Sequence, residues 1–468
     1  MLKKILIIFY TVLIISIISG CVRVTGSYIS DANSEERLLG ITERKEFSYE
    51  GSYRNPIIVI HGFLGANLID TKSGNIIWNK NLLKNPFSFS DMEIRALSFS
   101  MTKEKMFNSV LMAEKVSGSQ YSHLVKILHA GGYQQEGGEL DCGKNFYTLF
   151  QFSYDWRNDL QNNAVKFHQY LMKKKKYLQR EYEKLYGIKN YDVQFNVIAY
   201  GIGGLIARYY LRFGTADLPE LDEEIKVPWT GSRHLDKLIM LGTPNAGYLD
   251  SLIEIQRGCS FPSLPSAVLA TWPSYYQLMP ESSTNSVVYE ADYSKSVDLY
   301  DFKIWKQFKW GLMNPSQDNI LKILLPDTVP GKRKGIAIEY LKKLLQRAKR
   351  FKNAMRIKAH PPEDVKLYLF AGNAFKTRSK AVVNKETGNL RVIEFDTGDG
   401  KVLRSSALFD ERQGKRMWIP FFVSPIAWNG VINVRSAHMG IAATPCFEDN
   451  ILYLLRYIPY NKGEVRSD

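Results

Sequence analysis

The chain has 468 residues, of which 45% are hydrophobic and 13% aromatic. This composition is ample for a packed core and excludes a mainly disordered chain, and the length suits one large domain with insertions or two domains. The formal net charge is +15, but no nucleic-acid-binding motif accompanies it, so we expect no nucleic-acid partner.

Residues 1–20 have the pattern of a secretory signal peptide. Two lysines precede an uncharged apolar run over 5–18, which is short for a membrane span. The run ends in ISGC, with small residues before Cys21, and this resembles the lipobox of bacterial lipoproteins. We therefore expect removal of residues 1–20, lipidation of Cys21 and attachment to a membrane of the bacterial cell envelope on its extracytoplasmic side. The alternative is an uncleaved anchor with an incidental cysteine.

Residues 21–54 carry many charges and small polar groups, so they predict a tether to the folded part. The first predicted strand follows at Ile57–Ile60, where a continuous β-branched run is typical of a strand buried on both faces. No Cys/His spacing typical of a metal site occurs, so we expect no metal and no other cofactor. At most one internal disulfide is expected among Cys142, Cys259 and Cys446.

Strands and helices alternate along much of the remaining chain. Further strands are predicted within 146–156, 191–200, 234–244, 364–373 and 431–440. Helical patterns lie between or after them, over 158–186, 203–213 and 446–457. Strands that alternate with helices indicate βαβ units, so the predicted fold class is α/β with a mainly parallel sheet.

This alternation fails between residues 245 and 360. The stretch holds many aromatic residues and prolines, and a structureless loop of that length would be exceptional. We expect a cap subdomain over 245–360, between a first core part at 55–244, which includes a lid region at 66–110, and a second core part at 361–468. The aromatic side chains of the cap either face a lipid substrate or pack into a second small core.

Two basic runs, Met172–Arg180 and Gly331–Lys352, account for much of the net charge. Both lie in stretches with helical spacing of their apolar residues. We expect each basic run to form a helix face that is exposed to solvent. The alternative is attraction to anionic lipid headgroups, which would suit a tethered protein.

The stretch Phe195–Tyr210, FNVIAYGIGGLIARYY, predicts a strand, a tight turn and a helix. Such an elbow strains its central residue, so that its side chain points toward reacting groups beside a helix N-terminus. Here the nucleophile position falls on Gly201, which has no atom to attack with. The amide of Ile202, and a second amide from Phe63 or Leu64 after the first strand, predict an oxyanion hole.

An orienting acid and a general base should follow the elbow in that chain order. Asp399 lies in the glycine-rich turn DTGDGKV, and His438 lies in VRSAHMGI, just after a predicted strand. Either residue alone could be structural, because Asp-Gly is a common turn pair and a lone histidine often serves packing. Their order after an elbow favours a catalytic pair.

Taken together, the motifs resemble the lecithin:cholesterol acyltransferase family, a branch of the α/β-hydrolases that includes phospholipases A and lipid acyltransferases. They run in family order from about residue 56 to 455. The motifs are PIIVIHGFLGANLID with SGNIIW, FSYDWR, VIAYGIGGLIARYY, LIMLGTPNAG, LATWPSYYQLMP with LYDFKIW, TGDGKV and RSAHMGI.

The resemblance implies an α/β-hydrolase fold with an inserted cap, and a lipid or another acyl ester as substrate. It gives Asp399 and His438 the acid and base roles, and it places Phe63 and Ile202 in the oxyanion hole. It also implies substrate contacts for two further residues, Leu64 and Trp78, the second of which lies in a region that leads into a mobile lid. The family motif at Asp155 and Arg157 is interpreted as a local ion pair.

Two residues depart from the family pattern. Lys401 stands where a small hydroxyl residue commonly follows Gly-Asp-Gly, which is minor, and Gly201 replaces the serine nucleophile. Three accounts remain open: a lipid-binding pseudoenzyme, weak hydrolysis by a water that His438 activates, or an active acyltransferase or phospholipase in which the glycine is a variant. We favour a lipid-ester site with covalent acyl transfer lost or severely impaired. The alternative from another class is a non-catalytic lipoprotein that binds a protein partner, and the oligomeric state is open.

Overall fold

The computed structural model describes residues 54–79, 89–102, 109–260, 263–281, 284–411 and 423–456. The predicted signal peptide, Cys21 and the predicted tether up to residue 53 lie outside the described residues, as does part of the predicted lid region. Among the helices of the described ranges, none combines the length and the apolar character that crossing a membrane requires.

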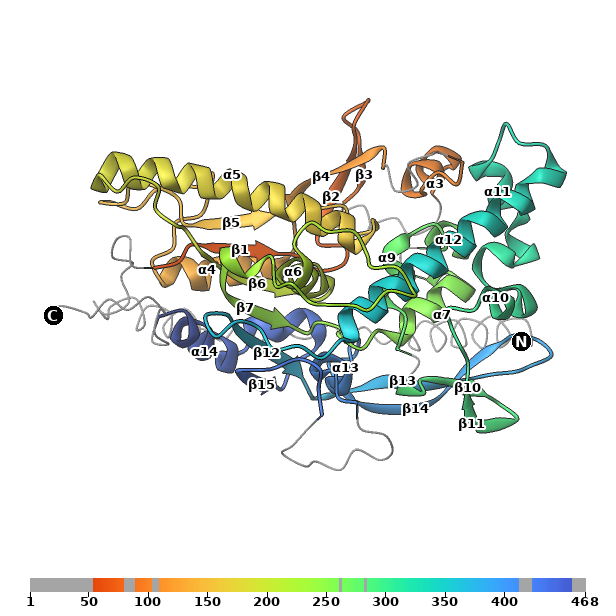
Figure 1. Ribbon diagram of the computed structural model, residues 1–468. Helices are drawn as coiled ribbons and strands as arrows, with labels where there is room; N and C mark the ends of the chain where they lie inside the picture. The colour runs from red at the N-terminus through yellow and green to blue at the C-terminus, as the bar shows by residue number, and fades with distance from the viewer. Residues whose placement is uncertain are drawn as a thin grey trace, which may run out of the picture.

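A six-stranded parallel sheet forms the centre of the molecule (Figure 1). In sheet order the strands are β15 (Gly430–Val434), β12 (Lys366–Gly372), β7 (Leu235–Leu241), β6 (Phe195–Tyr200), β1 (Ile57–Ile60) and β5 (Leu149–Phe152). Every strand predicted from the sequence lies in this sheet, and the parallel α/β prediction is confirmed. Because all six strands run the same way, their carboxyl ends meet along one edge, where α/β proteins bind ligands.

Helices cover both faces of the central sheet (Figure 1). They are α5 (Leu160–Tyr186) and α6 (Ile202–Phe213) on one face, and α4 (Ser119–Ala130) and α14 (Pro445–Arg456) on the other. In β1, Ile58 and Ile60 pack into the apolar layer of α5 and α6. Ile57 and Val59 pack into the layer of α4 and α14. Burial on both faces explains why the strand sequences are continuous apolar runs.

Two small antiparallel sheets and several short helices accompany the core and the cap. A three-stranded sheet joins β2 (Ala66–Asp70), β3 (Ile76–Trp78) and β4 (Leu111–Val116), and α3 (Asp91–Leu97) follows β3 in the chain. The other pair is β8 (Cys259–Ser260) with β9 (Ser263–Leu264). The 3-10 helix η4 (Ser232–His234) precedes β7, α13 (Arg404–Leu408) precedes β15, and η6 (Gly311–Met313) and η7 (Pro315–Gln317) lie in the cap.

A β-hairpin that the sequence analysis did not anticipate links the cap to the second core part. It consists of β13 (Phe375–Val383) and β14 (Leu390–Gly398), which pair antiparallel. β13 also pairs in parallel with β10 (Val287–Tyr289) of the predicted cap, and β10 pairs with β11 (Asp292–Ser296). Residues on both sides of the predicted boundary at 360 and 361 therefore share one four-stranded sheet.

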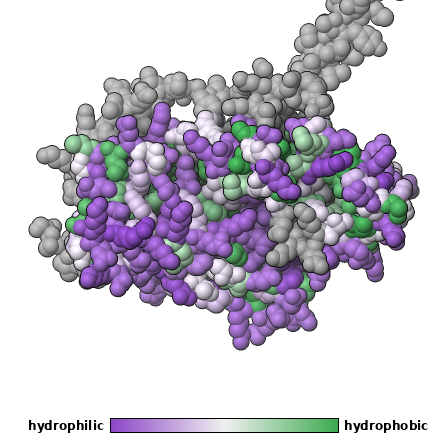
Figure 2. Space-filling model, turned by 90° about the horizontal axis from the view of Figure 1, so that it is seen from above, coloured by the Kyte–Doolittle hydropathy of each residue, from purple (hydrophilic) through white to green (hydrophobic). Residues whose placement is uncertain are grey.

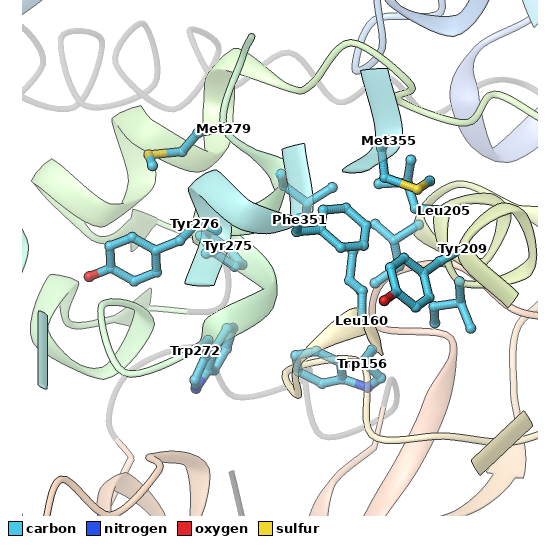
Figure 3. Packing of buried hydrophobic residues seen from close by; sticks show 14 of the residues in the cluster. Trp156, Leu160, Leu205, Tyr209, Trp272, Tyr275, Tyr276, Met279, Phe351 and Met355 are labelled. Atoms are coloured by element: carbon cyan, nitrogen blue, oxygen red, sulfur yellow. The ribbon is translucent and has the colours of Figure 1, made fainter. Parts of the chain in front are cut away.

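Most of the aromatic residues of the cap that the structure describes are buried, although Tyr293 is 55% exposed. The helices of the cap are α7 (Leu249–Arg257), α8 (Ser266–Leu269), α9 (Pro273–Leu278), α10 (Phe302–Phe308), α11 (Asp318–Leu324) and α12 (Pro330–Arg356). Trp272, Trp305 and Trp310 are at most 1% exposed, and they belong to the same apolar cluster as the α6 face of the sheet. Figure 3 shows Trp272 and Tyr276 of the cap in that cluster, together with Tyr209 of α6. Packing is thus the role of these tryptophans, in a core continuous with that of the sheet.

A buried ion pair fixes the cap to the core. The Nε and Nη2 atoms of Arg347 in α12 lie 2.7 and 2.9 Å from the two carboxylate oxygens of Asp159. Asp159 is fully buried, and it also accepts hydrogen bonds from the Asn162 amide at the start of α5 and from the Gln277 side chain of α9. One carboxylate therefore joins α5 to two helices of the cap.

Candidate active site

The turn between β6 and α6 has the predicted elbow geometry. β6 ends at Tyr200, Gly201 follows with φ of 51° and ψ of −122°, and α6 begins at Ile202. The Gly201 amide donates a hydrogen bond to the carbonyl of Leu241 in β7, at 2.8 Å. A side chain at position 201 would therefore be held in a strained backbone conformation that glycine adopts freely.

Two glycines allow α6 to approach the sheet closely. A Cβ atom on Gly203 would lie 2.5 Å from the carbonyl oxygen of His61, and one on Gly204 would lie 2.0 Å from Oγ1 of Thr243. Neither distance is possible between real atoms. These glycines therefore set the position of the helix N-terminus relative to the ends of β1 and β7.

Asp399 and His438 form the predicted acid–base contact. The Nδ1 atom of His438 lies 2.7 Å from Oδ2 of Asp399. The other oxygen of Asp399 accepts hydrogen bonds from the amides of Lys401 and Val402, at 2.9 and 2.6 Å, and its carbonyl accepts one from the His438 amide. Because a carboxylate only accepts, Nδ1 carries the proton and Nε2 is left as the base.

The Nε2 atom of His438 faces Gly201. A Cβ atom on Gly201 would lie 3.4 Å from Nε2 and 3.7 Å from Cα of Gly62, both ordinary contact distances. A Cβ atom would fit there without displacing a neighbour. The structure thus brings together Gly201, Asp399 and His438, which are far apart in the sequence.

The predicted oxyanion-hole residues flank the elbow. Ile202 is the first residue of α6, so its amide has no acceptor within the helix. Phe63 belongs to the loop after β1, where Gly62 approaches the elbow. The next residue, Leu64, has φ of 59°, which is rare for leucine and typical of functional loops. The oxyanion role of these amides stays a prediction.

His61 and Tyr121 hold the loop that carries Phe63. His61 is fully buried; its Nδ1 donates to the Gly62 carbonyl at 2.7 Å and its Nε2 accepts from the Tyr154 amide at 3.2 Å. Burial lowers the pKa of His61 to about 4, so the ring is neutral. The Tyr121 hydroxyl accepts from the Gly62 amide at 2.7 Å, and burial raises the pKa of Tyr121 to about 12.

Tyr200 supports His438 from the opposite face of the sheet. Its hydroxyl donates to the carbonyl of His438, and its ring stands edge-on to the imidazole with centroids 5.5 Å apart. Sequence reasoning assigned no role to Tyr121 or Tyr200. The sequence did hold one clue to Tyr200. It directly precedes the nucleophile position, and neighbouring residues of a strand point to opposite faces.

Leu64 and Trp78 differ in their accessibility to a substrate. Leu64 is partly exposed beside the elbow loop. Trp78 is 3% exposed, and its ring packs against Trp156, with centroids 5.3 Å apart. Trp156 in turn contacts the ring of Phe63 at 4.8 Å. Trp78 therefore supports the loop that carries Phe63 through Trp156, and substrate contact for Leu64 and Trp78 stays a prediction.

Asp155 and Arg157 form the local ion pair that was predicted. The Nη2 and Nε atoms of Arg157 lie 2.7 and 3.0 Å from the carboxylate oxygens of Asp155, and both side chains are buried. Arg157 also donates to the carbonyls of Ala96 and Leu97 and to the Ser109 hydroxyl. The pair therefore connects the end of β5 to the predicted lid region.

Within the described ranges, no group of three or more His, Cys, Asp and Glu side chains could hold a metal ion. The site consists of an acid–base pair, an elbow without a nucleophile, and two amides at the ends of neighbouring elements. Such an arrangement can bind an ester carbonyl and activate a hydroxyl group, but it cannot form an acyl-enzyme at position 201.

Comparison with known proteins identifies a similar family and similar solved structures. A family model described as lecithin:cholesterol acyltransferase matches residues 90–310, a range that includes the elbow and ends before Asp399 and His438. The predicted resemblance to that family is thereby confirmed. No curated protein matches the chain in sequence.

Several solved structures are similar to this chain at low sequence identity, one of them with a TM-score above 0.5. The Tle4–Tli4 complex contains a chain with a TM-score of 0.55 and 11% identity, and the match covers 85% of this chain and 97% of that one. A lipase of Bacillus licheniformis, BlEst2 in its mature form, has a TM-score of 0.33 and 12% identity, with coverages of 87% and 94%. Lipase 1 of Pelosinus fermentans has a TM-score of 0.35 and 11% identity, with coverages of 87% and 100%.

Proposed function

We propose that this chain, an α/β-hydrolase of the lipase and esterase type similar to the lecithin:cholesterol acyltransferase family, binds acyl esters of lipids at the site around Gly201. Covalent acyl transfer is lost or severely impaired. The protein acts at a membrane of the bacterial cell envelope, to which a lipidated Cys21 attaches it.

One observation carries the chemical part of the proposal. A Cβ atom on Gly201 would lie 3.4 Å from Nε2 of His438, while Nδ1 of the same ring lies 2.7 Å from Asp399. In enzymes of this type a serine at the elbow attacks the acyl carbonyl, and the histidine takes its proton. This chain has the histidine and the aspartate of that arrangement, but it lacks the serine hydroxyl that attacks.

The expected loss of turnover is large. Removing a serine nucleophile costs on the order of a million-fold in turnover, although binding and an oxyanion hole leave about 10³–10⁴ over the reaction in water. Any remaining hydrolysis would need a water that His438 deprotonates directly. Lipid binding does not depend on the nucleophile, so we expect it to persist.

A fluorophosphonate probe tests the chemical part. We expect no labelling of the protein as it stands, and labelling of Gly201→Ser at the new serine. Gly201→Ala also adds a Cβ atom at residue 201 but provides no hydroxyl, so this variant should stay unlabelled. Adding His438→Ala to Gly201→Ser should abolish labelling. A cleft residue that reacts in the unaltered protein would contradict the proposal, as would a folded Gly201→Ser protein that fails to react.

The membrane attachment has a separate test. Cells fed an alkyne-bearing fatty acid should incorporate it into the protein, and Cys21→Ser should abolish that incorporation. Lipid extraction and mass spectrometry of the purified protein then show whether an acyl lipid accompanies it. A protein partner that co-purifies in place of any acyl lipid would favour the alternative of a non-catalytic adaptor.

A further inference from the structure

The outer face of α5 carries a stripe of exposed cations. Between residues 161 and 180 the exposed positions are occupied by lysine, arginine and one glutamine, without an acidic residue. The cations that we call the basic stripe are Lys166, Lys173, Lys176, Arg180 and Lys184. At about 100° per residue they fall within an arc of about 80°, and at 1.5 Å per residue they extend over about 27 Å.

The remaining lysines of the same run point inward and have partners. Lys174 and Lys175 are 5% and 8% exposed. Lys174 pairs with Glu136, and Lys175 pairs with Asp192 at 2.7 Å. The expectation of a solvated face is therefore wrong for these two. The fold supplies acidic partners to the inward lysines, which cannot stay buried without them.

The basic stripe has no such partners in the described part of the chain, where no ion pair involves its members. The acidic residues on this part of α5 are Glu181 and Glu183, near its end. Stripe charges therefore repel one another, at a cost that an anionic partner would remove. Figure 2 looks onto this side of the molecule and shows hydrophilic residues over much of it.

Exposed apolar side chains belong to elements that follow one another between β1 and α4. In Figure 1 the three-stranded sheet rises at the right end of α5, and α3 lies beyond it, toward α11. They carry Ile76, Met92 and Met112, whose exposed fractions are 47%, 68% and 53%. Exposed lysines together with scattered large apolar residues suit the boundary between lipid headgroups and acyl chains. A nucleic acid would use the cations and leave the apolar residues in water.

We propose that the basic stripe docks the protein on an anionic phospholipid surface. This contact is independent of Cys21 and of the chemistry at Gly201, so it does not rest on the proposed function. Each cation near such a surface adds roughly fivefold to the binding constant at moderate ionic strength. The contact weakens as salt is added, because the Debye length shortens.

Vesicle binding tests the proposal. The full chain with Cys21→Ser is mixed with vesicles of phosphatidylcholine, alone or with phosphatidylglycerol, and the bound fraction is measured by sedimentation. The stripe variant combines Lys166→Gln, Lys173→Gln and Lys176→Gln. The control combines Lys332→Gln, Lys334→Gln and Lys343→Gln, which are exposed lysines of α12. Both variants lose the same charge, and both should keep the thermal unfolding midpoint of the parent.

We expect the parent to prefer vesicles with phosphatidylglycerol. The stripe variant should bind them on the order of a hundredfold more weakly, and the control less than about fivefold more weakly. If both variants lost the same amount of vesicle binding, the net charge alone would explain the binding, and the proposal would be overturned. Absence of a preference for phosphatidylglycerol would also overturn it. So would tighter binding to a DNA oligonucleotide than to the vesicles, which would assign the stripe to nucleic acid.

Discussion

The hydroxyl of Tyr121 accepts a hydrogen bond from the Gly62 amide at 2.7 Å, and this contact fixes the loop that presents Phe63 to the elbow. Gly62 and Tyr121 are both at the carboxyl edge of the sheet, where Gly62 also approaches Gly201. The amide of Gly62 is buried, so no water replaces the acceptor if the hydroxyl is removed. The loop would then shift to pair that amide elsewhere.

Tyr121→Phe in the Gly201→Ser background should slow fluorophosphonate labelling by about tenfold or more, because a small displacement of an oxyanion donor is costly in rate. The matched control is Tyr177→Phe, which removes a similar hydroxyl from the Tyr147 amide at 3.0 Å, far from the site. We expect that control to label at the parent rate. Equal slowing in both variants would show that Tyr121 acts only through stability.

Gly201→Ser should lower stability while it restores reactivity. At φ of 51° a side chain costs about 1–3 kcal/mol in backbone strain. The neighbours of the new Cβ are at ordinary contact distances, so strain is the main cost. Gly201→Ala should lose about the same free energy of unfolding, measured by denaturant titration. A serine variant as stable as the parent would contradict the strain argument.

The elbow and the acid–base pair could be predicted because their chemistry depends on residue types at defined places. A glycine-rich turn between a strand and a helix, and a histidine after a late strand, are visible in the sequence. The roles of Tyr121 and Tyr200 were not, because their hydroxyls bond to residues 59 and 238 positions away in the chain. Such contacts follow from packing, which a single sequence does not reveal.

The elements of the fold likewise divide into those that the sequence predicted and those that it did not. Each predicted strand of the central sheet was found, because strands buried on both faces are apolar throughout. The β13–β14 hairpin was missed, although the turn NKETGN between two alternating runs was a usable signal. The buried lysines of α5 were also missed. Their acidic partners Glu136 and Asp192 lie outside the helix, so helical spacing alone cannot find them.

Gly204→Ala should be strongly destabilising. Its Cβ would lie 2.0 Å from Oγ1, 2.7 Å from Cγ2 and 2.9 Å from Cβ of the fully buried Thr243, so rotation of the threonine side chain does not relieve the whole clash. We expect a loss of about 3 kcal/mol or more in the free energy of unfolding. Gly335→Ala is the control, because Gly335 lies in α12 with nothing within 4 Å of the added atom. That change should stabilise the protein by about 0.5–1 kcal/mol.

Arg347→Met should loosen the cap. The methionine keeps the apolar stem but leaves the Asp159 carboxylate buried without its cation, at a cost of about 3 kcal/mol. Limited proteolysis should then cleave within 245–360 sooner than in the parent. Lys342→Met removes an exposed pair with Glu339 on the same helix and should cost less than about 1 kcal/mol. Similar protease sensitivity in both variants would argue against a special role for Arg347.

Stability should fall with acid because of His61. Its pKa is about 4 in the folded protein, against 6.5 for the free side chain, and burial is the main cause. Below about pH 6.5 the unfolded chain binds a proton that the folded chain refuses, so the stabilisation is complete above that pH and is lost as the pH falls toward 4. The difference amounts to roughly 3 kcal/mol.

Denaturant titrations between about pH 7 and pH 4 measure this slope. His61→Gln should unfold more easily at neutral pH but should show a flatter dependence on pH, because glutamine does not titrate. His234 is a second buried ring whose pKa burial lowers to about 4, and it accounts for slope that remains in the His61 variant. The His234→Gln variant should keep the part of the pH dependence of stability that is due to His61. If His61→Gln leaves the slope unchanged, His61 is protonated in the folded protein, and a protonated Nε2 could not accept the Tyr154 amide.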